Sequence, residues 1–196
     1  MSITDRIYSV LIVSASKNFT DAVRSTLSSA RFEPLTVVGS VNAARRASAE
    51  QAYDLVLINS PLPDETGTRF AIDLCSAKGT VVLLLVSSEI HEEIFTETAS
   101  YGVFTLARPL SRSTFAIAMN WLLSARERLR RTEKKVFSIE EKMEEIRLVN
   151  RAKWILITEL KMDEPAAHRY IEKLSMDRCI SKGDVARSIL RTYLAK

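Results

Sequence analysis

Glycine and proline are scarce in this chain of 196 residues, with five of each. Neither occurs between Leu110 and Glu164. Both residues interrupt regular structure, so their absence over such a stretch predicts a long helix. Hydrophobic residues make up 46% of the chain and charged residues 27%. This balance excludes wholesale disorder, and the length suggests one or two domains with buried cores.

Cysteine and histidine are almost absent. Cys75 and Cys179 have no spaced partners, and His91 and His168 form no cluster with them, which excludes a disulfide framework and a zinc site. The longest fully apolar run, 81–86, is far too short to cross a membrane, and no signal peptide is visible. We therefore expect a cytoplasmic protein with reduced thiols, no membrane partner, no cofactor and no bound metal.

Excess positive charge is lacking in residues 1–112 and is confined to residues 113–196. Residues 1–112 hold 10 Lys and Arg against 12 Asp and Glu, whereas residues 113–196 hold 18 against 12. A basic half predicts contact with a polyanion. The sequence shows no nucleophile with a neighbouring base, no metal-ligand set and no phosphate-binding glycine loop. We therefore expect no catalytic residues and no enzyme.

Short apolar runs alternate with amphipathic stretches through the first half. This alternation predicts a parallel sheet covered by helices on both faces. Five strands in about 100 residues favour an α/β flavodoxin-like domain, with a ligand site beyond the carboxyl ends of the strands. The predicted strands are 7–13, 35–38, 54–58, 81–86 and 103–106, and the predicted helices lie near 18–31, 42–50, 68–77 and 89–100.

A heptad pattern of apolar residues begins at Phe115 and continues over five heptads, which predicts a coiled coil. In a parallel pair, Arg128 and Lys135 would each face a glutamate of the partner, whereas Lys142 would face an arginine. We therefore predict a parallel homodimer that weakens towards residue 147. The alternative is one amphipathic helix packed on its own domain. The residues expected in the dimer seam include Leu122, Leu129, Val136, Ile139, Met143 and Ile146.

The tail, 147–196, is predicted to form a small three-helix bundle. Asp163 followed by Pro165 is typical of a helix start, and Ser181 with Asp184 resembles a capping box. This segment holds 11 Lys and Arg against 6 Asp and Glu. Such a surface attracts phosphates, and several of its basic residues are spaced to share helix faces.

Aromatic residues lie among these charges and could stack with the splayed bases of RNA loops. Trp154 and Tyr193 are expected in the core rather than on this surface. The basic run 126–135 is expected to be an ordinary solvated face. The candidate RNA contacts are Arg151, Lys153, Arg169, Lys173, His168, Tyr170, Arg178 and Lys182.

The stretch 54–67, Asp-Leu-Val-Leu-Ile-Asn-Ser-Pro-Leu-Pro-Asp-Glu-Thr-Gly, resembles the receiver domain of bacterial response regulators. Pro63 and Gly67 stand where that family has a proline and a glycine after the third strand. Arg108-Pro109 matches the Lys-Pro step after its fifth strand. The resemblance covers roughly residues 5–112 and implies the doubly wound fold predicted above.

The phosphoacceptor site of the receiver is degenerate. Ser14 and Ala15 stand where the family has two acidic Mg²⁺ ligands, Asn59 replaces the phosphate-accepting aspartate, and Arg108 replaces the lysine. Ser87 remains as a hydroxyl near the end of the fourth strand. An amide is not a carboxylate nucleophile, and Mg²⁺ prefers carboxylate oxygens. We predict a pseudoreceiver, in which Asn59 bonds Arg108 or Ser87 or is merely a satisfied polar residue.

The tail resembles the ANTAR domain, the RNA-binding module of transcription antitermination regulators. The matching stretches are Arg-Ala-Lys-Trp-Ile-Leu at 151–156, Glu-Pro-Ala-Ala-His-Arg-Tyr-Ile at 164–171 and Asp-Val-Ala-Arg-Ser-Ile at 184–189. Trp154 stands where the family commonly has glycine. The expected organisation is a pseudoreceiver domain at 1–112, a coiled-coil dimerisation helix at 113–146 and an ANTAR bundle at 147–196.

The resemblance implies a dimer that binds paired stem-loops in a leader transcript and prevents the terminator from forming. Control would come from a regulatory protein partner or a ligand, because phosphorylation of the receiver is not expected. One alternative is a DNA-binding response regulator with a helix-turn-helix, although Gly183 and Asp184 are a poor opening for a recognition helix. Another is a dimeric protein-interaction scaffold that does not contact nucleic acid.

Overall fold

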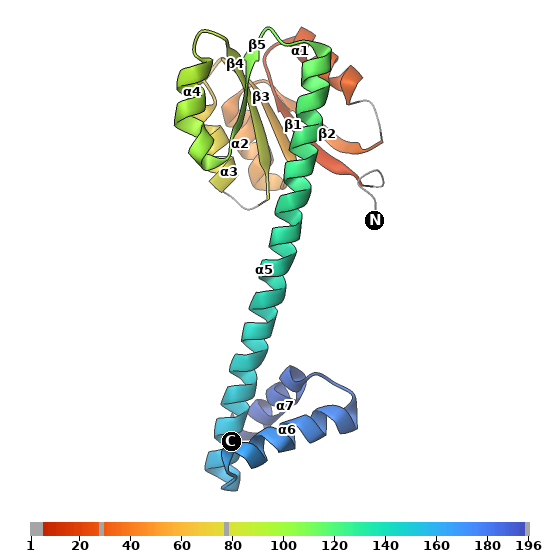
Figure 1. Cartoon of the computed structure of the whole chain (residues 1–196), viewed down its shortest axis with the longest axis vertical. Coiled ribbons are helices and arrows are strands. Elements are labelled where there is room, and N and C mark those ends of the chain that lie inside the picture. Colours follow the sequence, from red (N-terminus) through yellow and green to blue (C-terminus); the bar gives the residue numbers. More distant parts are fainter. Residues whose placement is uncertain (1–5, 28–29, 77–78, 195–196) are drawn as a thin grey trace. The chain divides into compact units, whose positions relative to one another are not determined.

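The chain forms two compact units, Met1–Arg131 and Thr132–Lys196, in a computed structural model that describes residues 6–27, 30–76 and 79–194. One helix, α5 (Arg112–Leu160), contributes residues to both units (Figure 1). It confirms the long helix predicted from the stretch without glycine or proline.

The first unit is built on a five-stranded parallel sheet with the order β2-β1-β3-β4-β5. This is the flavodoxin-like order, and it confirms the predicted fold class. All five predicted strands form, with ends that differ by a few residues. Their bounds are β1 Tyr8–Val13, β2 Phe32–Val38, β3 Leu55–Asn59, β4 Val81–Ser87 and β5 Phe104–Arg108.

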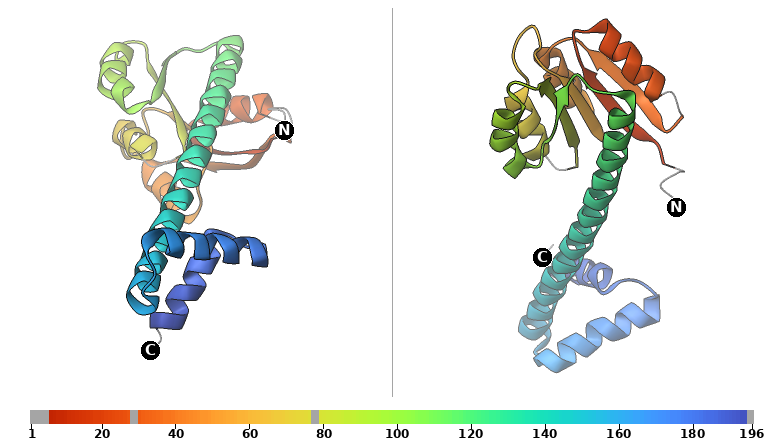
Figure 2. Two further views of the ribbon diagram at one scale, coloured as in Figure 1. Left: turned by 60° about the horizontal axis from the view of Figure 1, so that its bottom comes forward. Right: turned by 45° about the horizontal axis from the view of Figure 1, so that its top comes forward.

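Helices cover both faces of this sheet (Figure 2). On one face, α1 (Lys17–Thr26) and the first turns of α5 pack over a core that includes Tyr8, Leu57 and Leu122. On the other face, α2 (Val41–Glu50), α3 (Thr68–Ser76) and α4 (His91–Thr98) cover a core that includes Val56 and Phe70. Because β3 and most of β4 are buried on both faces, their sequences are continuous apolar runs.

One predicted helix, at 18–31, ends earlier than expected. α1 ends at Thr26, and residues 28–29 of the predicted segment 18–31 lie outside the described residues. α3 ends at Ser76, and residue 77 of the predicted segment 68–77 also lies outside them. The last predicted helix is divided into α4 and a short 3-10 turn, η2 (Ala99–Tyr101).

Gly67 is required by the turn that leads into α3. Its φ is +81°, and a Cβ built at this position would lie 2.9 Å from Cγ2 of Ile58. Both the backbone conformation and the lack of space favour glycine. The glycine of the receiver-like motif therefore has a local structural cause.

A cluster of charged side chains connects α5 to the amino-terminal ends of the central strands. Asp54 Oδ1 accepts hydrogen bonds from Nε of Arg126 at 2.8 Å and from Nη2 of Arg130 at 2.7 Å. Glu127, which is buried, accepts from the Tyr8 hydroxyl at 3.0 Å and pairs with Arg6. The basic run expected to be a solvated face is thus partly used inside the first unit.

The second unit consists of the last turns of α5 with α6 (Glu164–Arg178) and α7 (Lys182–Leu194). The Asp163 carboxylate caps α6 by accepting from the backbone N–H of Ala166 at 2.7 Å, as predicted. The Ser181 hydroxyl accepts from the N–H of Asp184 at 3.0 Å and so caps α7. A small apolar core joins the three helices: Ala152, Leu156, Ala167, Ile171, Val185, Ala186 and Ile189.

Within the described residues, no helix combines the length and the apolar character needed to span a membrane.

Candidate functional site

Two residues of the predicted degenerate phosphoacceptor site are joined by a hydrogen bond. The Asn59 amide donates to Oγ of Ser14 at 3.0 Å, and both side chains are buried. The expected bond from Asn59 to Arg108 or Ser87 is not formed, and Arg108 donates to the backbone carbonyl of Ser60. The alternative of a satisfied polar residue holds only for the Asn59 amide nitrogen, because Oδ1 of Asn59 is buried with no hydrogen-bond partner among the described residues. Ala15 is exposed and Ser87 is half-buried.

Asp64, which follows Asn59 in the loop after β3, has a structural role. Asp64 accepts backbone N–H bonds from Val41 at 3.0 Å and from Asn42 at 2.8 Å, at the start of α2. These bonds lower the pKa of the Asp64 carboxyl. Across the described ranges, no group of three or more His, Cys, Asp or Glu is placed to hold a metal ion.

The candidate RNA contacts of the second unit divide into two groups. In the first group, the basic side chain already has an acidic partner. Nζ of Lys153 lies 2.7 Å from Oε1 of Glu164, and the Lys153 side chain is only 16% exposed. Lys182 and His168 both face Oε1 of Glu172, at 2.5 Å and 3.4 Å. Hydrogen bonds from Lys153 and Lys182 lower the pKa of Glu164 and of Glu172.

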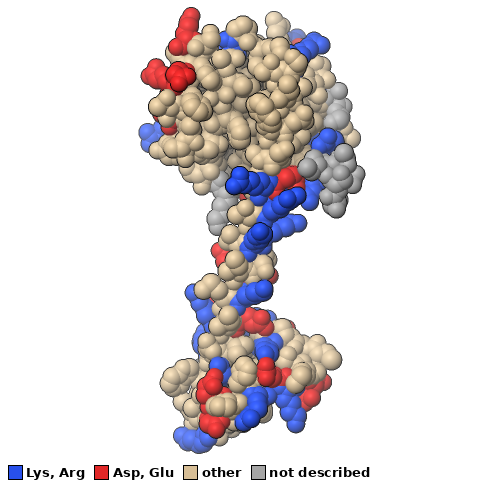
Figure 3. Space-filling view, in the orientation of Figure 1, with Lys and Arg blue, Asp and Glu red and all other residues tan. Residues whose placement is uncertain are grey.

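The second group is exposed and unpaired. Arg151, Arg169, Lys173 and Arg178 are exposed, and none makes an ion pair with another described residue. Tyr170, next to Arg169 on α6, is also exposed. Charges without internal partners remain free to meet phosphates. Figure 3 shows basic and acidic side chains interspersed over the second unit.

Trp154 is the residue that the sequence interpretation placed wrongly. It was expected in the core, yet its side chain is 69% exposed on α5. It lies three residues after Arg151, so the two side chains share one face of the helix. Tyr193 packs against the bundle core, as expected. The residues beside Trp154 on α5, Ala152, Ile155 and Leu156, already fill the buried face of the helix. Their spacing in the sequence could have predicted that Trp154 lies outside the core.

The expected dimer seam divides at about the boundary between the two units. Leu122 is 1% exposed and lies in the core of the first unit, together with Phe115 and Ala118. The first heptads therefore follow the alternative of a helix packed on its own domain. The later seam residues are all exposed in the single chain: Leu129, Val136, Ile139, Met143 and Ile146.

Comparisons with known proteins match different parts of the chain to different families. A family model described as "ANTAR domain" matches residues 138–190. The sheet unit is similar to the signal receiver domain of an HD domain-containing protein from Pseudomonas fluorescens Pf-5, with a TM-score of 0.58 at 17% identity over 67% of this chain and 97% of that one. It is also similar to the chemotaxis response regulator CheY4 of Vibrio cholerae, with a TM-score of 0.52 at 22% identity over 59% of this chain and 98% of that one.

Residues 138–190 thus match the ANTAR domain, and the sheet unit has the fold of receiver domains. The chain is similar to the transcriptional regulatory protein PdtaR of Mycobacterium tuberculosis, strains CDC 1551 / Oshkosh and H37Rv. The identity is 27% over 139 residues, which is 71% of this chain and 68% of the relative. The matching relatives are regulatory proteins.

Proposed function

We propose that this protein is a cytoplasmic, non-enzymatic transcription antitermination regulator that binds RNA stem-loops through its second unit. A dimer would hold two neighbouring stem-loops of a leader transcript and so prevent formation of the terminator hairpin. The observation that carries the proposal is the ANTAR match over 138–190 together with the unpaired basic residues on the same segment.

The chemistry of the exposed side chains supports RNA loops as the ligand. Arg151 and Arg169 supply charge, and Trp154 and Tyr170 supply exposed rings beside them. Unstacked loop bases stack on such rings and on guanidinium planes, while the phosphates bind the positively charged groups. Lys153 and Lys182 are weaker candidates as direct contacts, because each already pairs with a glutamate of the bundle.

Exposed apolar residues on α5 support a parallel coiled-coil dimer. Val136, Ile139 and Met143 recur at heptad spacing and are exposed in the single chain. Burying such a stripe removes apolar surface from water, and a second copy offers the same stripe. Two bundles on one dimer would raise the affinity for paired stem-loops because the second contact is intramolecular.

Control without phosphorylation is supported by the side chains at the predicted phosphoacceptor site. Asn59 offers no carboxylate, and its amide is engaged with Ser14. A regulatory protein partner or a ligand would then act on the receiver-like unit or on the dimer.

The direct test is electrophoretic mobility of the full chain with RNA of one and of two hairpins. We expect the two-hairpin RNA to bind at least tenfold more tightly than the one-hairpin RNA, within the usual gain from linked sites. A DNA duplex of the same length serves as the control. Equal affinity for that duplex would contradict the proposal and favour a DNA-binding regulator, and no affinity for any nucleic acid would favour a protein scaffold.

A further inference from the structure

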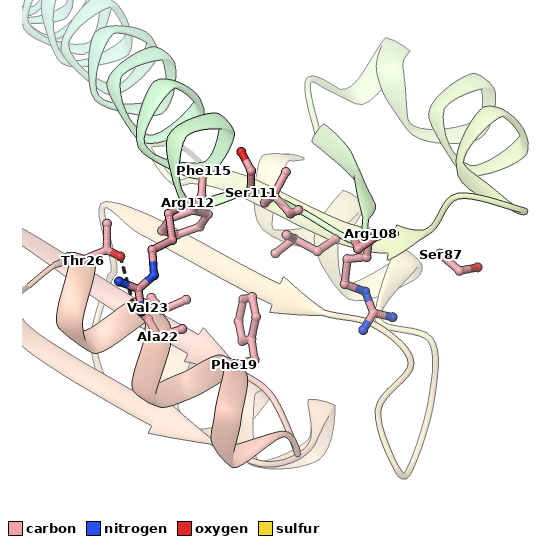
Figure 4. Close-up of a pocket in the computed structure, with 12 residues that line it drawn as sticks. Phe19, Ala22, Val23, Thr26, Ser87, Arg108, Ser111, Arg112 and Phe115 are labelled. Atoms are coloured by element: carbon pink, nitrogen blue, oxygen red, sulfur yellow. Dashed lines mark hydrogen bonds between the residues drawn. The ribbon is translucent and has the colours of Figure 1, made fainter.

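A cavity of about 420 Å³ lies in the first unit, on the face of the sheet that α1 and α5 cover (Figure 4). Its floor and walls include Phe19 and Val23 of α1, Leu85 of β4 and Phe115 of α5. The volume falls within the range of small-molecule sites in proteins. Of the residues predicted for the degenerate phosphoacceptor site, Ser87 and Arg108 line this cavity and Ser14, Ala15 and Asn59 do not, so the cavity adjoins that position.

The charge of the lining has one sign. Arg108 and Arg112 both line the cavity, and its lining contains no carboxylate. Figure 4 shows the two guanidinium groups on either side of Phe19. Within the described residues, Arg112 makes no ion pair. An anion placed here would meet one of two cations and no competing acid of the lining.

A polar atom of the lining also lacks a partner. Nε of Arg108 is buried and has no hydrogen-bond acceptor among the described residues, while another nitrogen of the same guanidinium donates to the Ser60 carbonyl. A buried donor without an acceptor is uncommon in a folded protein. An acceptor brought by a ligand would satisfy it, and guanidinium groups bind carboxylates with good geometry.

We propose that this cavity binds a small organic carboxylate with an aromatic or branched aliphatic body. The apolar body would lie between Phe19, Val23 and Phe115, and the carboxylate would face Arg108 or Arg112. Such a ligand would contact α1 and the first turn of α5 together, and so stabilise the packing of α5 on the sheet. The proposal does not depend on RNA binding by the second unit.

The test is calorimetric titration of the full chain with three acids: benzoate, 3-phenylpropionate and 4-methylpentanoate. The uncharged amide of each acid is the matched ligand control. At least one acid is expected to bind at millimolar concentration or below, and about tenfold more tightly than its amide, as a charge-assisted hydrogen bond implies. Binding of no acid at millimolar concentration, or equal binding of every acid and its amide, would overturn the proposal.

Variants then locate the site. Ala22→Trp places a ring into the cavity from the exposed surface of α1 and is expected to abolish binding. Arg112→Gln is expected to weaken binding of the acid about tenfold and to leave the amide unchanged. Arg24→Gln, on α1 but outside the lining, is the control and should bind as the unaltered chain does. Unchanged binding by Ala22→Trp, with its fold verified by circular dichroism, would place the ligand elsewhere and refute the assignment.

Discussion

At the scale of single residues, exposure separates the side chains proposed to contact RNA from the side chains that hold the fold. Arg151 and Trp154 face solvent on α5, whereas Lys153 between them is mostly covered and paired with Glu164. Asp54 is covered as well, and its two arginine partners come from α5. Substitutions of the exposed residues should therefore change binding, and substitutions of the covered ones should change stability.

Trp154→Ala is expected to weaken RNA binding about tenfold and to leave the fold intact. Stacking of a base on an aromatic ring contributes about 1–3 kcal/mol, and 1.4 kcal/mol corresponds to tenfold in affinity. The measurement is the dissociation constant for a hairpin RNA. Trp121→Ala is the matched control, because Trp121 is also exposed (60%) but lies in the first unit. A loss as large for Trp121→Ala as for Trp154→Ala would contradict the stacking role.

Asp54→Asn is expected to destabilise the first unit by about 2 kcal/mol, less than the ~3–5 kcal/mol typical of breaking a fully buried pair. The substitution leaves Arg126 and Arg130 without the carboxylate that both contact. Urea unfolding followed by circular dichroism measures the loss. Asp73→Asn is the control: Asp73 pairs with Arg45 on the surface, where an ion pair contributes little. Equal effects of the two substitutions would refute a structural role for the cluster.

The same carboxylates set a pH dependence. Burial raises the pKa of Asp54, but the hydrogen bonds from Arg126, Ser9 and Arg130 lower it by more than burial raises it. The net shift of the Asp54 pKa is therefore downward. The pKa of Glu127 is also lowered, because hydrogen bonds from Arg6 and Tyr8 outweigh the rise caused by burial. A pKa lowered by folding stabilises the protein above the unfolded-state pKa, and this contribution disappears as pH falls through the folded-state pKa. Stability should therefore fall below about pH 4.5, and less steeply in Asp54→Asn; identical acid limbs for both proteins would contradict this account.

At the scale of secondary-structure elements, α5 carries one apolar stripe that is buried in its first turns and exposed in its later ones. Its first turns, with Phe115 and Leu122, are buried on the sheet of the same chain. Its later heptads, from Leu129 onwards, remain exposed. The heptad pattern alone is continuous across both parts, so it cannot tell an intramolecular from an intermolecular partner.

Ile139→Asp is expected to shift the chain from dimer to monomer, because a charge at a seam position must be buried in a coiled coil. Binding to two-hairpin RNA should weaken at least tenfold, and binding to one hairpin should not change. Sedimentation velocity measures the first effect and mobility shift the second. Ser138→Asp adds the same charge at a neighbouring exposed position outside the seam and should remain dimeric. Dissociation of both variants, or of neither, would refute the proposed seam.

Much of the element pattern could be predicted from sequence. The five strands are short apolar runs bounded by turns, and a long stretch without glycine or proline becomes α5. What could not be predicted depends on three-dimensional neighbours. Asn59 bonds Ser14 rather than Arg108 because the carbonyl of Ser60 takes the Arg108 guanidinium. Trp154 is exposed because smaller residues fill the bundle core, and helical periodicity alone does not rank competing residues.

At the scale of the whole molecule, the two units are proposed to have different functions: regulation in the first unit and RNA binding in the second. The receiver-like unit has Ser14, Ala15 and Asn59 at the positions predicted for the phosphoacceptor site, and the second unit carries exposed basic residues without ion-pair partners among the described residues. Regulation would then pass through ligands, partners or the dimer rather than through phosphate.

Incubation with acetyl phosphate and Mg²⁺ is expected to leave the intact mass of the protein unchanged. Asn59→Asp alone should not change this result, because Ser14 and Ala15 supply no carboxylate for the metal. Restoring all three positions, with Ser14→Asp, Ala15→Asp and Asn59→Asp, is the positive comparison. A phosphoryl adduct on the unaltered chain would show that the receiver-like unit still accepts phosphate and would contradict control without it.

The most direct test of the proposed RNA recognition by a dimer is sedimentation of the full chain alone and with a two-hairpin RNA, at several salt concentrations. The account predicts a complex of two chains with one RNA, whose affinity falls as salt rises because phosphate contacts release counterions. Arg151→Gln combined with Arg169→Gln should reduce the salt slope by about 0.7 for each lost contact. Monomers that sediment unchanged with RNA, or an affinity independent of salt, would contradict it.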